Sequence, residues 1–210
     1  MFKKFNGRCF IVMVFGILIM GLGVCLFNIS KLGCGPAASL QIAFGEKYGF
    51  GISGGMIITN TIFFIAEIIW GRDYIGPGTF VNWFGVGTTA EIWTKFLTSF
   101  IDFPEQFLGR VIIMILGVLI LSLSASIYQT ADQGISPYDS LSLIIERKTK
   151  FKYHWCRIFT DAASVSLAFL LGGIVNIGTL ISVTCLGPFI SFYNRVISIP
   201  LCYGKKKADH

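Results

Sequence analysis

Four ionisable side chains stand inside stretches of this 210-residue chain that are otherwise apolar. Arg157 and Asp161 are four residues apart, which places them on one face of a helix and predicts an ion pair, either structural or functional. Glu91 follows a run of small residues, and Glu67 precedes Arg72 closely enough to reach a membrane interface. A carboxylate within a membrane is costly unless it pairs or faces water, so Asp161 and Glu91 are candidates to line a path for a solute or a proton.

A second group of candidates surrounds two prolines. Pro36 and Pro137 open short segments at 36–48 and 137–149, and proline is favourable in the first turn of a helix. A helix of about a dozen residues spans roughly 18 Å, which is too short to cross about 30 Å of hydrocarbon and indicates a re-entrant or interfacial half-helix.

Two such helix N-termini that met near the bilayer middle would offer backbone N–H donors to a polar or anionic solute. Asp139 is expected either to cap free N–H groups or to offset anion affinity and carry a proton. The predicted pathway residues of the two turns are Gly33, Gly35, Pro36, Ser39, Gly134, Ser136, Pro137, Asp139 and Ser140.

The sequence lacks the residue patterns that enzymes and cofactor sites require. It has no H-E-x-x-H motif and no evident Ser/His pair, so we expect no enzyme and no catalytic residues. Two histidines and six cysteines without a C-x-x-C predict no metal and no cofactor. GFGISG at 49–54 matches a dinucleotide fingerprint without its strand, and no Walker motif is present. The basic residues that give the net charge of +6 lie beside apolar segments, so no nucleic-acid partner is expected.

Composition predicts an all-α polytopic membrane protein. Hydrophobic residues make up 54% of the chain and charged residues 13%. The uncharged stretch 9–30 is too long for a cleaved signal and is expected to remain as the first helix. The predicted transmembrane helices are six, at 9–29, 51–71, 78–97, 109–130, 155–173 and 178–199, in addition to the two half-helices.

The chain repeats itself at an offset of about 101 residues. Gly, Pro, Ser and Thr positions of the first half recur in the second, and Asn60 is the counterpart of Asp161, which adds Asn60 to the predicted pathway. One membrane domain, 1–210, would then contain repeat 1 at about 9–97, repeat 2 at about 109–199 and a basic cytoplasmic tail at 203–210. Three crossings in each half predict two inverted-topology repeats with both termini cytoplasmic, where most basic residues fall. The alternative is eight helices in parallel repeats.

Three segments resemble the YczE/YyaS/YitT family of bacterial integral membrane proteins: GLGVCLFNISKLGCGPAASL at 21–40, ASIYQTADQGISPYDSL at 125–141 and GGIVNIGTLISVTCLGP at 172–188. The resemblance implies the bacterial cytoplasmic membrane and, as a general expectation, transport. Family members often follow the turn with an aromatic residue or arginine and then an aspartate. Tyr138 and Asp139 keep that pattern, whereas Ala37 and Ala38 do not, so a single acidic site is expected in the second half.

These features predict a small secondary transporter or permease for a small polar or anionic solute, with alternating access between the repeats. The alternative is a non-transporting accessory or regulatory protein that partners another membrane complex. The expected partners are the lipid bilayer, a small-molecule substrate, and a second copy or another membrane protein.

Overall fold

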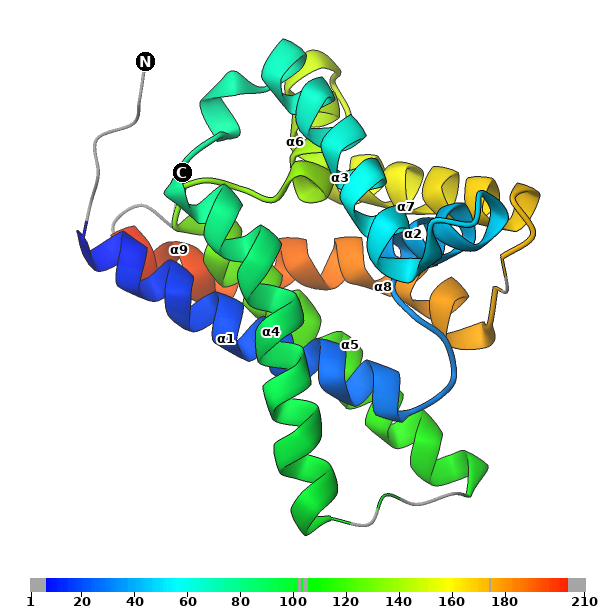
Figure 1. Cartoon of the computed structure of the whole chain (residues 1–210). Helices are drawn as coiled ribbons and strands as arrows, with labels where there is room; N and C mark the ends of the chain where they lie inside the picture. Colours follow the sequence, from blue (N-terminus) through cyan, green and yellow to red (C-terminus); the bar gives the residue numbers. More distant parts are fainter. Residues whose placement is uncertain (1–6, 102, 104–105, 174, 204–210) are drawn as a thin grey trace.

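The computed structural model describes residues 7–101, 103, 106–173 and 175–203, which fold into helices without a strand among them. The predicted basic tail lies outside these residues except for Tyr203. The elements, labelled in Figure 1 where there is room, are α1 (Gly7–Ile29), α2 (Pro36–Lys47), α3 (Gly51–Trp70), the 3-10 turn η1 (Arg72–Tyr74), α4 (Pro77–Phe100), α5 (Phe107–Thr130), α6 (Pro137–Lys148), α7 (Tyr153–Leu170), α8 (Ile177–Tyr193), the π-helical segment η2 (Asn194–Ser198) and α9 (Ile199–Tyr203).

The helices have the composition of a membrane protein. Among the described residues, α1, α5 and the continuous helix Ile177–Tyr203 are long and apolar enough to cross a bilayer, and Gly54–Trp70 is a shorter apolar helix. Large apolar side chains face outward, and Phe84, Phe100 and Leu170 are each at least 70% exposed. So much exposed apolar surface requires an apolar surrounding. The prediction of a helical membrane protein is therefore confirmed. Helices α3, α4 and α7 occupy the residues of the other three predicted spans, but they are not among the described helices that are long and apolar enough to cross.

The centre of the fold is the crossing of α1 and α5. Cβ atoms placed on Gly16 and Gly23 would lie within about 3.3 Å of Tyr128 and Leu121 of α5, and one placed on Gly117 would lie 2.9 Å from the nitrogen of Phe27. Residue numbers rise along α1 as they fall along α5, so the two helices are antiparallel. Glycine allows this close approach because it has no side chain.

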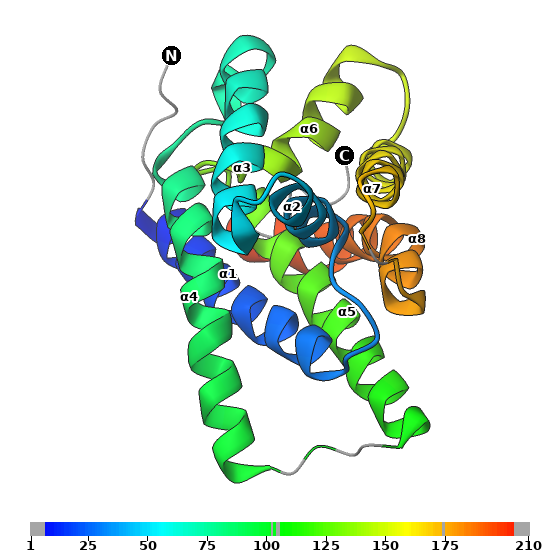
Figure 2. The same ribbon diagram turned by 45° about the vertical axis from the view of Figure 1, so that its right-hand side comes forward.

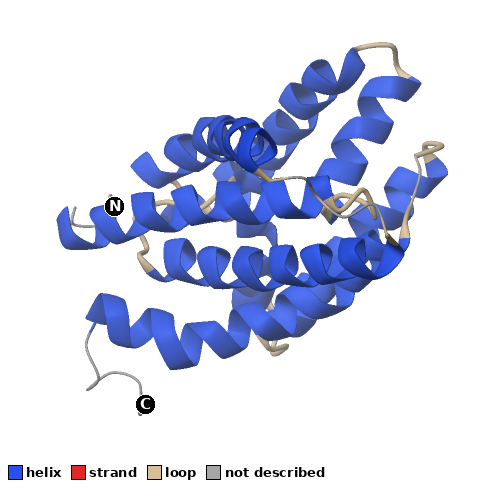
Figure 3. Ribbon diagram, turned by 90° about the horizontal axis from the view of Figure 1, so that it is seen from below, coloured by secondary structure: helices blue, strands red, loops and turns tan. Residues whose placement is uncertain are grey.

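The remaining helices are arranged around this pair. α4 packs on α1 and α8 packs on α5, while α2, α3, α6 and α7 form a group of four in which each helix packs on two of the others. Figure 2 shows this group above the central pair, and Figure 3 shows from below that the described residues form helices and loops. The group of four contains both short helices, α2 and α6.

Reciprocal contacts join the two halves. The amide of Gly178 donates to the carbonyl of Leu32, and the amide of Gly78 donates to the carbonyl of Gln133, each over 2.9 Å. These are matching positions at the repeat offset, so the loop before each short helix binds the first turn of the last long helix of the other half.

The two halves nevertheless pack unequally. A Cβ on Gly187 of α8 would lie 2.8 Å from the carbonyl oxygen of His154 in α7. Gly87, its counterpart on α4, has nothing within 4 Å of a Cβ. α7 packs along α8, whereas the described residues of α3 and α4 share few contacts, among them those of the Phe64 ring with Phe80 and Trp83.

Candidate functional site

The first turn of α6 begins at Ser136, whose side chain caps the helix. Ser136 Oγ accepts a hydrogen bond from the amide of Asp139 over 3.2 Å, and the Ser136 carbonyl accepts from the amide of Ser140 over 2.9 Å. Serine at this position satisfies an otherwise unpaired helix donor. The expectation that Asp139 caps this helix is therefore wrong, and its carboxylate is left available for α7.

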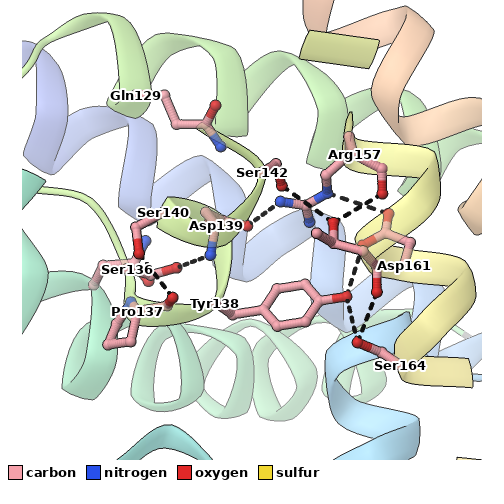
Figure 4. Close-up of polar contacts among 12 residues, drawn as sticks. Gln129, Ser136, Pro137, Tyr138, Asp139, Ser140, Ser142, Arg157, Asp161 and Ser164 are labelled. Atoms are coloured by element: carbon pink, nitrogen blue, oxygen red, sulfur yellow. Dashed lines mark hydrogen bonds and ion pairs between the residues drawn. The ribbon is translucent and has the colours of Figure 1, made fainter. Parts of the chain in front are cut away.

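Arg157 of α7 joins two buried carboxylates. Its Nε donates to Asp161 Oδ2 over 3.1 Å, and its Nη1 donates to Asp139 Oδ1. Figure 4 shows Asp139 and Asp161 on two sides of the guanidinium. The planar, fork-shaped donor set of arginine suits this bridging geometry. We call Asp139, Arg157 and Asp161 the ion network.

Two tyrosines complete the ion network. Tyr138 donates to Asp161 Oδ1 over 2.7 Å, and its ring lies beneath the Arg157 guanidinium at 5.1 Å. Tyr128 of α5 donates to Asp139 Oδ2. Together with Tyr128, the ion network connects α5, α6 and α7. It contains two carboxylates and one guanidinium. A buried cluster with an excess of acid favours a proton or a cation.

The equivalent place in the first half is neutral. Gln41 Nε2 donates to Asn60 Oδ1 over 3.0 Å, where the second half has Ser142 and Asp161. Ser39 lies 3.1 Å from the Cys34 sulfur. Met56 and Ala38 occupy the positions that correspond to Arg157 and Asp139. The charged residues of the ion network therefore all belong to the second half, and their first-half counterparts are neutral.

The structure divides the predicted site residues into separate groups. Asp139 and Asp161 meet at the α6–α7 contact through Arg157. Ser136, Pro137 and Ser140 lie at the N-terminal turn of α6, and Ser140 lies beside Glu67 of α3. The first-half candidates lie at α2 and its neighbours: Gly33, Gly35, Pro36, Ser39 and Asn60.

Two glycines and one acid stand apart from the ion network. Cβ atoms placed on Gly33 and Gly134 would lie within 3 Å of Thr179 and Gly76, so each turn packs against the other half. Glu91 is exposed on α4, paired with Lys95 at 2.8 Å, because its helix face points away from the core.

Several amides at and before the N-terminal turns of α2 and α6 already have hydrogen-bond partners. The amide of Ile135 donates to the carbonyl of Tyr74 over 2.9 Å, and the amides of Asp139 and Ser140 are taken by Ser136. The amide of Cys34 donates to Thr179 Oγ1 over 3.4 Å. These amides are therefore occupied, whereas Gly35 at the start of α2 provides no side-chain cap to the amides of that helix.

Sequence reasoning missed Tyr128 at this site and placed Glu67 at a membrane interface instead of here. Tyr128 lies on α5, and no local spacing links it to Asp139. Glu67 is fully enclosed and lies beside Ser140 and Asp139 of α6. It does not reach an interface with Arg72, whose Nε donates to the carbonyl of Ile68 over 2.8 Å. The repeat offered one signal for the burial of Glu67. At the offset of 101 residues its counterpart is Ala168, which is buried.

A cavity of about 350 Å³ opens beside the network. The Tyr153 hydroxyl donates to Gln129 Oε1 over 3.1 Å at its wall, and the Gln129 amide nitrogen has no partner among the described residues. Burial raises the pKa of the Tyr74 phenol, which keeps it neutral. The described residues that line the cavity include two carboxylates and no lysine or arginine. They are Tyr74, Gln129, Thr130, Asp132, Ile135, Leu143, Glu146, Tyr153, Asn194, Ile199 and Tyr203.

Comparison with known proteins gives one family and several relatives. A model described as a family of unknown function (DUF6198) matches residues 7–195. An uncharacterized protein of Haemophilus influenzae is 26% identical over 191 residues, covering 89% of this chain and 84% of its own. The uncharacterized protein YyaS of Bacillus subtilis is 28% identical over 172 residues, covering 82% of this chain and 85% of its own. The uncharacterized membrane protein YczE of Bacillus subtilis is 23% identical over 178 residues, covering 84% and 81%. No solved structure matches the chain significantly.

Proposed function

The chain belongs to the family of unknown function DUF6198, and we propose that it is a small secondary transporter or permease with alternating access between two inverted repeats. The predicted resemblance to YczE and YyaS is confirmed by the matches to both proteins. The proposed solute is small and polar. The panel of neutral, cationic and anionic solutes described below tests the polar or anionic solute that the sequence predicts.

The proposed topology has six crossings, with α2 and α6 re-entrant. The antiparallel crossing of α1 and α5 supports it, because these helices are equivalent in the repeat and would run in the same direction in parallel repeats. The length of 12 residues in each short helix also supports re-entry. The basic residues predicted to be inside support the proposal that both termini lie in the cytoplasm of a bacterium.

The observation that carries the transport proposal is the unequal packing at Gly87 and Gly187. Two equivalent helix pairs, α3 with α4 and α7 with α8, have different arrangements, one loose and one close. In inverted-repeat transporters, access alternates when one repeat moves against the other around a fixed site. We propose a second state in which Gly87 packs against α3 and Gly187 separates from α7, with the ion network beside the path.

Gly87→Leu is predicted to leave the present state folded and to stop transport. A leucine here meets open space now, but would hold α4 away from α3 in the proposed second state. Thermal unfolding in detergent should be unchanged, while solute-driven currents from proteoliposomes on a solid-supported membrane should disappear. Thr88→Leu, at the next exposed position of α4, is the control and should keep its currents. Full currents in Gly87→Leu would contradict the second state.

Asp161→Asn is predicted to reduce solute flux to the level of empty liposomes. The substitution keeps the shape of the side chain but removes a charge from the ion network, leaving Arg157 with one carboxylate. Flux is measured over a panel of small neutral, cationic and anionic solutes. Glu91→Gln, which disturbs only an exposed pair, should behave as the unaltered protein. Absence of flux for every solute in the unaltered protein would favour the accessory role.

A further inference from the structure

Glu67 is a buried acid that lies outside the ion network. Its side chain is fully enclosed, and neither carboxyl oxygen has a hydrogen-bond partner among the described residues. One turn further along α3, a Cβ on Gly71 would lie 2.6 Å from the side chain of Ile144, so this end of α3 lies directly against α6. An ionised carboxylate with no partner is very costly in such a place.

The hydrogen-bond donors around Glu67 point to the neutral acid. The Ser140 hydroxyl lies beside it, but its one hydrogen is donated to the carbonyl of Pro137 over 2.9 Å. Toward Glu67 this hydroxyl offers only lone pairs, and a carboxylate also only accepts. The two groups are complementary only when Glu67 carries a hydrogen. The nearby charge of Asp139 further disfavours a second anion.

The other charged or titratable groups on elements that pack against α3 have other partners or lie away from Glu67. Arg147 of α6 pairs with Asp73 of η1 at 2.8 Å, and Tyr74 donates to the carbonyl of Leu143 over 3.4 Å. Tyr138 donates to Asp161. Glu46 and Lys47 of α2 lie at the opposite end of α3 from Glu67. The remaining charged or titratable groups on these elements are Arg72, Asp73, Tyr74, Tyr138, Asp139, Glu146, Arg147 and Lys148.

The acid is confined to one of two equivalent contacts. The α3–α6 contact contains Glu67, whereas the matching α7–α2 contact contains Ala168, with Ala43 packed against Gly173. α3 is also the helix that would meet α4 in the proposed second state. In this structure α7 packs on α8 and keeps its contact with α2, so α3 is expected to keep its contact with α6 when it packs on α4.

We infer that Glu67 is a proton-binding site, which holds a proton while its carboxyl group is enclosed at the contact of α3 with α6. The bound ligand is the proton itself, and the site needs no metal. Coupling of this proton to solute movement rests on the proposed transport function, whereas the proton site stands on the geometry of α3 and α6 alone.

Infrared spectroscopy of the purified protein in lipid nanodiscs tests the proton site. At neutral pH the unaltered protein should show the C=O stretching band of a protonated carboxyl group, and this band should disappear as the pH is raised. Glu67→Gln, which has nearly the same shape and is always neutral, should fold and lack the band. Glu91→Gln should keep it. A band equally strong in Glu67→Gln, or no such band in the unaltered protein, would overturn the inference.

A second measurement separates the proton site from the transport function. Proteoliposomes containing a pH-sensitive dye are given the solute panel described above, and uptake and internal pH are followed together. Coupling predicts that solute entry changes the internal pH in the unaltered protein and does not in Glu67→Gln. Solute flux with no pH change in the unaltered protein would refute coupling and leave transport intact. The infrared band without any flux would refute transport and leave the proton site intact.

Discussion

Arg157→Met is expected to lower the free energy of unfolding by about 3–5 kcal/mol, the usual cost of removing one partner from a buried ion pair. Asp139 and Asp161 would remain enclosed together without a cation, and the Tyr138 ring would lose the guanidinium above it. The two carboxylates would repel each other, and one would have to take up a proton. Reversible unfolding in SDS, followed by circular dichroism, measures the loss.

Two comparisons make this result specific to the ion network. Adding Asp139→Asn and Asp161→Asn to Arg157→Met removes the uncompensated charges and should recover most of the lost stability. Lys95→Met breaks an exposed pair with Glu91 and should have no measurable effect. Equal stability of Arg157→Met and Lys95→Met would show that the network is not buried as the structure has it.

Gly134→Ala is expected to destabilise the protein by about 3 kcal/mol or more. Gly134 has a φ of +120°, and a Cβ there would lie 2.8 Å from Gly76 Cα and from the backbone nitrogen of Thr79. The backbone conformation costs a residue with a side chain about 1–3 kcal/mol. Overpacking against backbone atoms costs about as much again, because the first turn of α4 must shift. The melting temperature in detergent and the monodisperse fraction on size exclusion should both fall.

The repeat supplies matched controls for this prediction. Gly33→Ala should cost a similar amount, since Gly33 has a φ of +149° and its Cβ would lie 2.9 Å from the backbone nitrogen of Thr179. Gly35→Ala should cost little, because Gly35 has a φ of −60° and nothing within 4 Å of a Cβ. A large loss for Gly35→Ala, or none for Gly134→Ala, would contradict the reciprocal packing of the two loops.

The sequence alone located the elements well wherever local geometry decides them. Pro36 and Pro137 predicted two short helices, and α2 and α6 begin at these residues and end within one residue of the expected limits. The predicted spans 155–173 and 178–199 imply a break between them, and Gly172 has a φ of +92° between α7 and α8. Proline and glycine act through their own backbone preferences, so these features need no information about distant contacts.

The partners of the buried polar groups could not be predicted in the same way. The four-residue spacing predicted that Arg157 and Asp161 share a helix face, and the structure pairs them. It could not predict that Asp139 would join them, that Tyr128 would reach it from α5, or that Glu91 would face outward while Glu67 is enclosed.

From its sequence by itself, this protein is a helical membrane chain with a repeated pattern and two proline-led short helices. Only the tertiary structure decided that α1 and α5 cross antiparallel, that Gly87 is open where Gly187 is packed, and that the buried acids gather where α3 and α7 meet α6. The reason is that hydrophobic composition and backbone preference are local properties. The face that a helix turns toward its neighbours depends instead on close packing with residues about a hundred positions away.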